Sequence, residues 1–144
     1  MPRLSRFFLR GGFVCLAVGM LVGGLILVQK GTGRFPTLWV LLPAHVYLVL
    51  VGGVTQCALG VSYWILPRLG AGRGRGNTAW AWSSYWALNA AILLIALHPA
   101  VEAVLGAPAA SMTFLSGGLL QGVAAVAFVL HAWPRIRPSQ TSPR

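Results

Sequence analysis

Four apolar stretches, each long enough to cross a bilayer as a helix, follow one another along the 144-residue chain. A hydrocarbon core about 30 Å thick needs roughly 20 residues of helix. The apolar positions predict spans at residues 11–29, 38–66, 79–97 and 109–133. The connections are short and contain Gly, Pro or charged residues, so we expect neighbouring helices to be antiparallel. The prediction is an all-α membrane protein whose residues 1–134 form one four-helix transmembrane bundle.

Composition supports a location in lipid. Hydrophobic residues make up 57% of the chain and charged residues only 8%, whereas a soluble domain carries about 25% charged residues. The bilayer of the cell (inner) membrane is therefore the expected surrounding. A net charge of +10 would suggest nucleic acid in a soluble protein. Here the basic residues flank the spans, where they orient helices and contact headgroups, so we expect no nucleic-acid partner.

The basic residues also predict an orientation. Nine of the eleven lie in the N-terminal segment, the connection after the second span and the C-terminal tail: Arg3, Arg6, Arg10, Arg68, Arg73, Arg75, Arg135, Arg137 and Arg144. The opposite side has only Lys30 and Arg34. Because cytoplasmic loops carry the excess of Lys and Arg, both termini are expected in the cytoplasm. Residues 135–144 lack apolar periodicity and are expected to form a basic, disordered cytoplasmic tail.

The second span contains the most informative polar residues. At 100° per residue, one face of this helix would present His45, Gly52, Gln56 and Tyr63. One interpretation is a helix–helix seam, with hydrogen bonds across the bundle and Gly52 allowing close approach. The other is a cofactor face, with His45 as an imidazole ligand and Gly52 leaving room for a flat macrocycle. The residue pattern leaves both open.

The remaining polar residues in the spans are few. Asn89 in the third span and Gln121 in the fourth are expected to face the bundle interior, because polar groups are costly in lipid. His98 ends the third span on the same side as His45, as either a second ligand to a shared metal or an interfacial histidine. His131 lies near the opposite face of the bilayer and cannot share an iron with His45.

The sequence lacks the catalytic residues that several classes of enzyme require. Glu102 is the only acidic residue, so there are no paired carboxylates for acid–base chemistry and no acid inside a span. Cys15 and Cys57 both fall inside apolar stretches, where a thiol behaves as a small hydrophobe. No phosphate-binding loop is present. These absences argue against an enzyme that acts alone.

Part of the chain resembles a known family. The second span opens on His45, continues through small residues and closes on the sequence Gly60-Val-Ser-Tyr63-Trp-Ile-Leu-Pro67. The third span then contains Ser84-Tyr-Trp. This order resembles the second and third helices of the catalytic subunit I of haem–copper oxidases, a superfamily that includes the large subunit of nitric oxide reductases.

The resemblance implies a limited set of properties. His45 would match the family's low-spin haem ligand and would therefore bind the iron of haem b. The copper-ligating histidines of the family lie on later helices that this sequence does not contain, so no copper site and no complete oxidase are expected. The implied function is a small oxidase-like subunit in respiratory electron transfer, working with other membrane subunits. The alternative is a non-catalytic structural or assembly subunit without a cofactor.

Overall fold

The structure is a computed structural model that describes residues 1–69 and 74–136. Within those ranges every regular element is a helix, as the sequence predicts. Four helical segments are long and apolar enough to cross a membrane: Arg3–Thr32, Pro36–Ile65, Thr78–Ala96 and Ala107–Ile136. Each overlaps one predicted span, so the all-helical class and the four candidate spans are confirmed.

The first span is one unbroken helix, α1 (Arg3–Thr32). It ends where Gly33 adopts a left-handed conformation with φ of 67°, and the Gly33 amide donates to the Gln29 carbonyl at 2.8 Å. A left-handed glycine is the usual helix stop, since it has no Cβ to clash. The sharp turn that follows sends the chain back along α1.

The second span changes its winding along its length. It comprises the 3-10 turn η1 (Pro36–Leu41), α2 (Leu42–Tyr47), the π-helical segment η2 (Leu48–Thr55) and α3 (Gln56–Ile65). Pro36 and Pro43 lie in the first turns of η1 and α2, where a missing amide donor costs little. The π-helical hydrogen bonds join residues five apart, which widens the turn in the middle of the span.

The C-terminal half contains α4 (Thr78–Ala96), α5 (His98–Leu105) and α6 (Ala107–Ile136). Residues 98–108, expected as a plain connection, are mostly the short helix α5, whose first turn accommodates Pro99. The last helix includes Arg135 and Ile136 and therefore extends beyond the predicted end of the fourth span. The rest of the expected tail, residues 137–144, lies outside the described residues.

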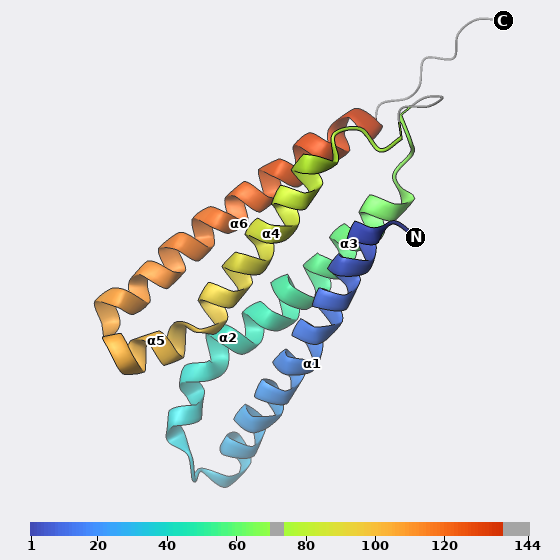
Figure 1. The fold of residues 1–144 in the computed structure, drawn as a ribbon. Coiled ribbons are helices and arrows are strands. Elements are labelled where there is room, and N and C mark those ends of the chain that lie inside the picture. Colours follow the sequence, from blue (N-terminus) through green and yellow to red (C-terminus); the bar gives the residue numbers. More distant parts are fainter. Residues whose placement is uncertain (70–73, 137–144) are drawn as a thin grey trace, which may run out of the picture.

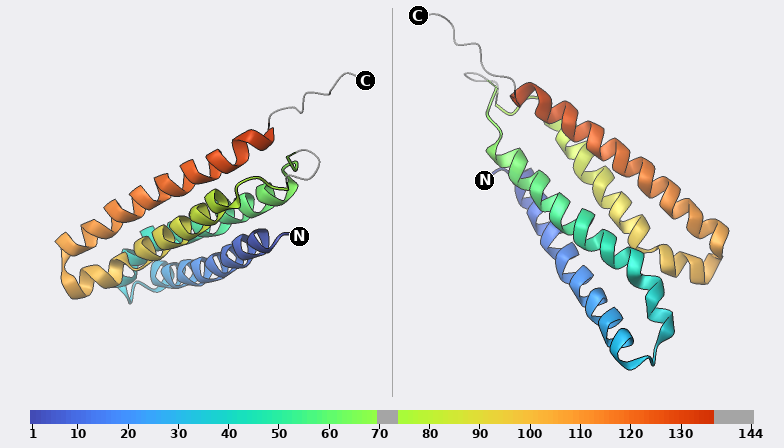
Figure 2. Two further views of the ribbon diagram at one scale, coloured as in Figure 1. Left: turned by 45° about the horizontal axis from the view of Figure 1, so that its top comes forward. Right: turned by 180° about the vertical axis from the view of Figure 1, so that it is seen from behind.

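The long helices associate as two pairs, α1 with the second span and α4 with α6 (Figure 1). The N-terminus, the end of α3, the start of α4 and the end of α6 lie at one end of the bundle. We call this the termini end. The α1–η1 turn and α5 lie apart from each other at the opposite end (Figure 2). Around Phe8 the two pairs are joined by an aromatic core, in which its ring lies 5.1 Å from Tyr85 and 6.4 Å from Phe128.

Candidate functional site

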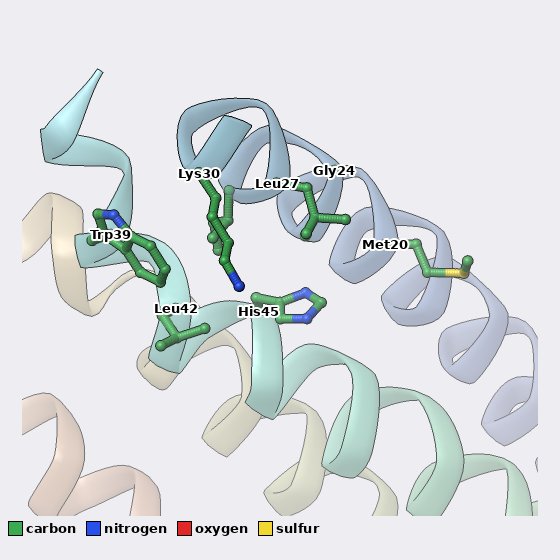
Figure 3. A pocket seen from close by; sticks show the side chains of 9 residues that line it. Met20, Gly24, Leu27, Lys30, Trp39, Leu42 and His45 are labelled. Atoms are coloured by element: carbon green, nitrogen blue, oxygen red, sulfur yellow. The ribbon is translucent and has the colours of Figure 1, made fainter. Parts of the chain in front are cut away.

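An open apolar groove of about 470 Å³ lies where the end of α1 faces the start of the second span. Its lining is mostly apolar, from Met20, Gly23, Gly24, Ile26, Leu27, Trp39 and Leu42, with Lys30 and His45 as the polar members. Figure 3 shows the Lys30 amine extending toward the His45 ring, with Trp39 and Leu42 on the opposite wall. The groove thus combines one imidazole, one cation and a largely hydrophobic surface.

The backbone of α1 fixes the position of His45. Its Nδ1 atom lies 2.7 Å from the Gly19 carbonyl oxygen. A carbonyl only accepts, so Nδ1 carries the proton and the neutral ring keeps its lone pair on Nε2. Gly23 makes the close approach possible, because a Cβ there would lie 2.5 Å from His45 Cε1. An imidazole that donates one N–H to a backbone carbonyl has the usual arrangement of a metal-ligating histidine.

His98 has different surroundings. Its Nδ1 lies 3.0 Å from both the Ala110 carbonyl and the Thr113 hydroxyl on α6. Its ring centre lies 3.9 Å from that of Phe114, with the two rings tilted by 39°, and Nε2 lies 3.7 Å from Glu102. His45 faces α1 whereas His98 faces α6, so the structure does not bring the two predicted ligands together. His98 is therefore held by α5 and α6 at the end of the bundle.

His45, Gly52 and Gln56 of the second span all lie close to α1, where Gly23, Cys15 and Gly11 are their respective neighbours. Gln56 also donates to Asn89 on α4 at 3.2 Å, and Tyr63 stacks on His131 of α6 at 5.2 Å. The positions on this face stay beside α1 as far as Gln56, although a π-helical segment lies between His45 and Gln56. Tyr63, near the end of α3, has its ring partner on α6 instead.

Gly52 packs closely against neighbouring helices, whereas a cofactor face would need open space beside it. A Cβ built at Gly52 would lie 2.8 Å from the Cβ of Cys15 and 3.4 Å from Ile92. The space beside this glycine is therefore filled by α1 and α4, and no room for a macrocycle exists there. This contact agrees with the seam interpretation, in which small residues let helix backbones approach.

The other predicted interior residues join the two helix pairs. Gln56 is fully buried, its Nε2 donates to Asn89 Oδ1, and Asn89 Nδ2 donates to the Tyr85 carbonyl at 2.8 Å. Gln121 accepts a hydrogen bond from the hydroxyl of Tyr47. Tyr47 was not predicted from the sequence. It lies two residues after His45 and faces the opposite helix pair. Together these bonds form a polar seam across the bundle.

A second polar cluster, at the termini end, was not predicted as a unit. It consists of Tyr63, His131 and Arg135, with the Arg75 guanidinium 5.7 Å from the Tyr63 ring centre. His131 Nδ1 donates to the Asn77 carbonyl at 3.0 Å, and His131 Nε2 accepts from Arg135 at 2.9 Å. Both ring nitrogens of His131 are therefore satisfied in its neutral form.

Arg135 donates hydrogen bonds to the backbone carbonyls at the end of α3. Its guanidinium donates to the carbonyls of Pro67 at 3.0 Å, Leu66 at 2.6 Å and Tyr63 at 3.3 Å, and the side chain is only 2% exposed. A cation suits this place, since the last carbonyls of a helix lack partners and carry partial negative charge. The spacing of His131 and Arg135 by four residues is the only sequence signal for this cluster.

In the part of the chain that the structure describes, no three His, Cys, Asp or Glu side chains gather closely enough to hold a metal ion together. Comparison with protein-family models, curated proteins and solved structures finds no match for this chain. The candidate site therefore rests on its own geometry.

Proposed function

We propose that this chain is a multi-pass membrane subunit that binds a b-type haem through His45 and takes part in respiratory electron transfer. The observation that supports it most is the hydrogen bond from His45 Nδ1 to the Gly19 carbonyl. That bond orients the ring and leaves the Nε2 lone pair for a metal ion. Within the described residues, the structure assigns Nε2 no hydrogen bond of its own.

The groove offers residues that would hold a haem through one ligand from this chain. His45 would supply the ligand, Leu27, Leu42 and Trp39 an apolar wall, and Lys30 a cation for a haem carboxylate. A bound haem would supply one-electron redox chemistry. This chain's residues would hold the haem edge away from water and set the basicity of the ligand through the Gly19 carbonyl.

A second ligand to the iron would come from another subunit or from an added small molecule. His98 is engaged with α6 and α5, as its contacts with Ala110 and Glu102 indicate. Met20 is the other groove residue with an atom that haem iron accepts, but its side chain points away from His45 (Figure 3). A partner in the membrane is therefore part of this proposal.

The resemblance to oxidase subunit I supports the same choice of ligand. In that family a histidine at the start of the second helix binds a low-spin haem, and here His45 lies in the first turn of α2, two residues after Pro43. The chain contains three histidines in all, too few for the family's haem and copper ligands together. We therefore propose an accessory, haem-carrying subunit rather than an oxygen-reducing one.

We further propose that the termini end of the bundle faces the cytoplasm and that the groove at His45 lies near the opposite surface. Among the described residues, six arginines belong to segments at the termini end: Arg3, Arg6, Arg10, Arg68, Arg75 and Arg135. The positive-inside rule assigns that end to the cytoplasmic side. Electron exchange at His45 would then occur near the outer face of the cell membrane.

Haem titration of haem-free protein in detergent tests the proposed site. We expect a Soret band that saturates at about one haem per chain, as a single histidine-ligated site requires. His45→Ala should abolish this saturable binding, whereas the matched control His98→Ala should bind as the wild type does. Equal binding by wild type and His45→Ala would contradict the proposal, because the haem would then lie elsewhere.

A structural or assembly subunit is the second candidate, and a groove between α4 and α6 favours it. This apolar groove of about 570 Å³ includes Trp80, Gly118 and Gly122, and a Cβ built at either glycine would meet no atom within 4 Å. Exposed small residues four apart are typical of faces where membrane helices dock. Loss of a co-purifying membrane subunit in Gly122→Leu, with a haem-free wild type, would support this candidate instead.

A further inference from the structure

Three arginines converge on one cavity at the start of α1. This cavity, about 320 Å³ in volume, is lined by Arg3, Arg6, Phe7 and Arg10. The three basic residues are three, four and seven positions apart, a spacing that puts them on one side of a helix. Like charges this close repel each other, so their convergence calls for a negative partner.

No acidic side chain of this chain lies near the three arginines. Glu102 is its only acidic residue. Glu102 belongs to α5, 3.7 Å from His98, and α5 lies at the opposite end of the bundle from the start of α1 (Figure 1). No acidic side chain of this chain therefore balances the arginines, which leaves them available to a negatively charged ligand.

The aromatic residues beside the cavity indicate what kind of molecule. Phe7 is 46% exposed, and its ring centre lies 5.6 Å from Trp82 and 6.0 Å from Tyr85 of α4. Aromatic rings of this kind gather at the level of lipid headgroups. The cavity thus joins guanidinium groups, which bind phosphate through paired hydrogen bonds, to an aromatic surface that suits a glycerol or acyl segment.

We propose that Arg3, Arg6 and Arg10 bind the phosphate of an anionic phospholipid, with Phe7 against its glycerol and upper acyl chain. The site is independent of haem and of His45, because it lies at the other end of α1. A lipid bound there would fix the depth of α1 in one leaflet and place a negative charge beside the three arginines.

The test uses the full-length protein in vesicles of phosphatidylcholine mixed with brominated phosphatidylglycerol, which quenches nearby tryptophans. We expect the wild type to prefer phosphatidylglycerol. Arg6→Gln should lower that preference about tenfold, the loss that follows from about 1.4 kcal/mol for a direct hydrogen bond to a charged phosphate. Arg6→Lys, which keeps the charge, should retain most of the preference.

Arg68→Gln is the matched control, since it removes one exposed charge from the segment that follows α3. At physiological ionic strength it should change the preference by less than about twofold, because salt screens an exposed charge that makes no direct contact with the phosphate. Equal losses in Arg6→Gln and Arg68→Gln would overturn the proposal in favour of diffuse surface attraction. Displacement of the lipid by millimolar inorganic phosphate would also overturn it, since the site would then be one for the free ion. A wild type that shows no preference for phosphatidylglycerol would overturn the proposal too.

Discussion

Arg135 Nη1 lies 2.9 Å from Nε2 of His131, one helical turn earlier on α6. The same guanidinium donates to three carbonyls at the end of α3, so one side chain joins the two helix pairs at the termini end. No carboxylate takes part. The charge is balanced by helix-end carbonyls and by the Tyr63 ring, whose centre lies 5.5 Å from the guanidinium carbon.

Arg135→Ala should destabilise the protein by about 3 kcal/mol, because several hydrogen bonds from a charged donor are lost and the α3 carbonyls lose their partner. Denaturation in detergent, followed by circular dichroism, measures this change. Arg68→Ala, which removes an exposed charge nearby, should change the free energy of unfolding by less than about 0.5 kcal/mol. Similar values for the two variants would contradict the role assigned to Arg135.

Gly23→Ala should weaken haem binding roughly tenfold, because a Cβ 2.5 Å from His45 Cε1 forces the imidazole out of place. The neighbouring Gly24→Ala is the control, since its Cβ would meet no atom within 4 Å. Haem titration of both variants distinguishes them. If Gly23→Ala binds haem as tightly as Gly24→Ala, the position of His45 against α1 does not matter for the cofactor.

Gln56 and Asn89 should be energetically coupled. A double-mutant cycle of Gln56→Leu and Asn89→Leu, measured by unfolding in detergent, should give a coupling energy of about 0.6–1.5 kcal/mol, the range for hydrogen bonds between membrane helices. The energy should be favourable, because each single variant leaves a buried amide without its partner. Strictly additive effects would show that the bond contributes nothing to holding the helix pairs together.

Fusion reporters should reveal the orientation. Alkaline phosphatase joined after Arg144 should be inactive, and green fluorescent protein joined there should fluoresce, because the positive-inside rule keeps that end in the cytoplasm. Phosphatase joined after Gly106, between α5 and α6, should be active. The reverse pattern would invert the proposed topology and move His45 to the cytoplasmic face.

Some features of the fold could be read from sequence because they depend on hydrophobicity alone. The four spans are predictable from their length and apolar composition. The π-helical winding of the second span between His45 and Gln56 was not predicted. Nothing in the local sequence marks residues 48–55 as π-helical.

The candidate site was predictable only in part. His45 stands out as a histidine within an apolar span, but its neighbours Gly19 and Gly23 depend on how α1 packs against it. Arg135 could not be found, because its partners lie on α3, about half the chain away in sequence. Contacts between helices are set by packing geometry, which a single sequence does not display.

The absorption spectrum of the protein purified from its own membranes tests the central proposal most directly. We predict a Soret band with the visible bands of a b-type haem, present in the wild type and lost in His45→Ala purified in the same way. A wild-type protein without a Soret band, or a band unchanged by His45→Ala, would contradict the proposal that His45 holds a haem.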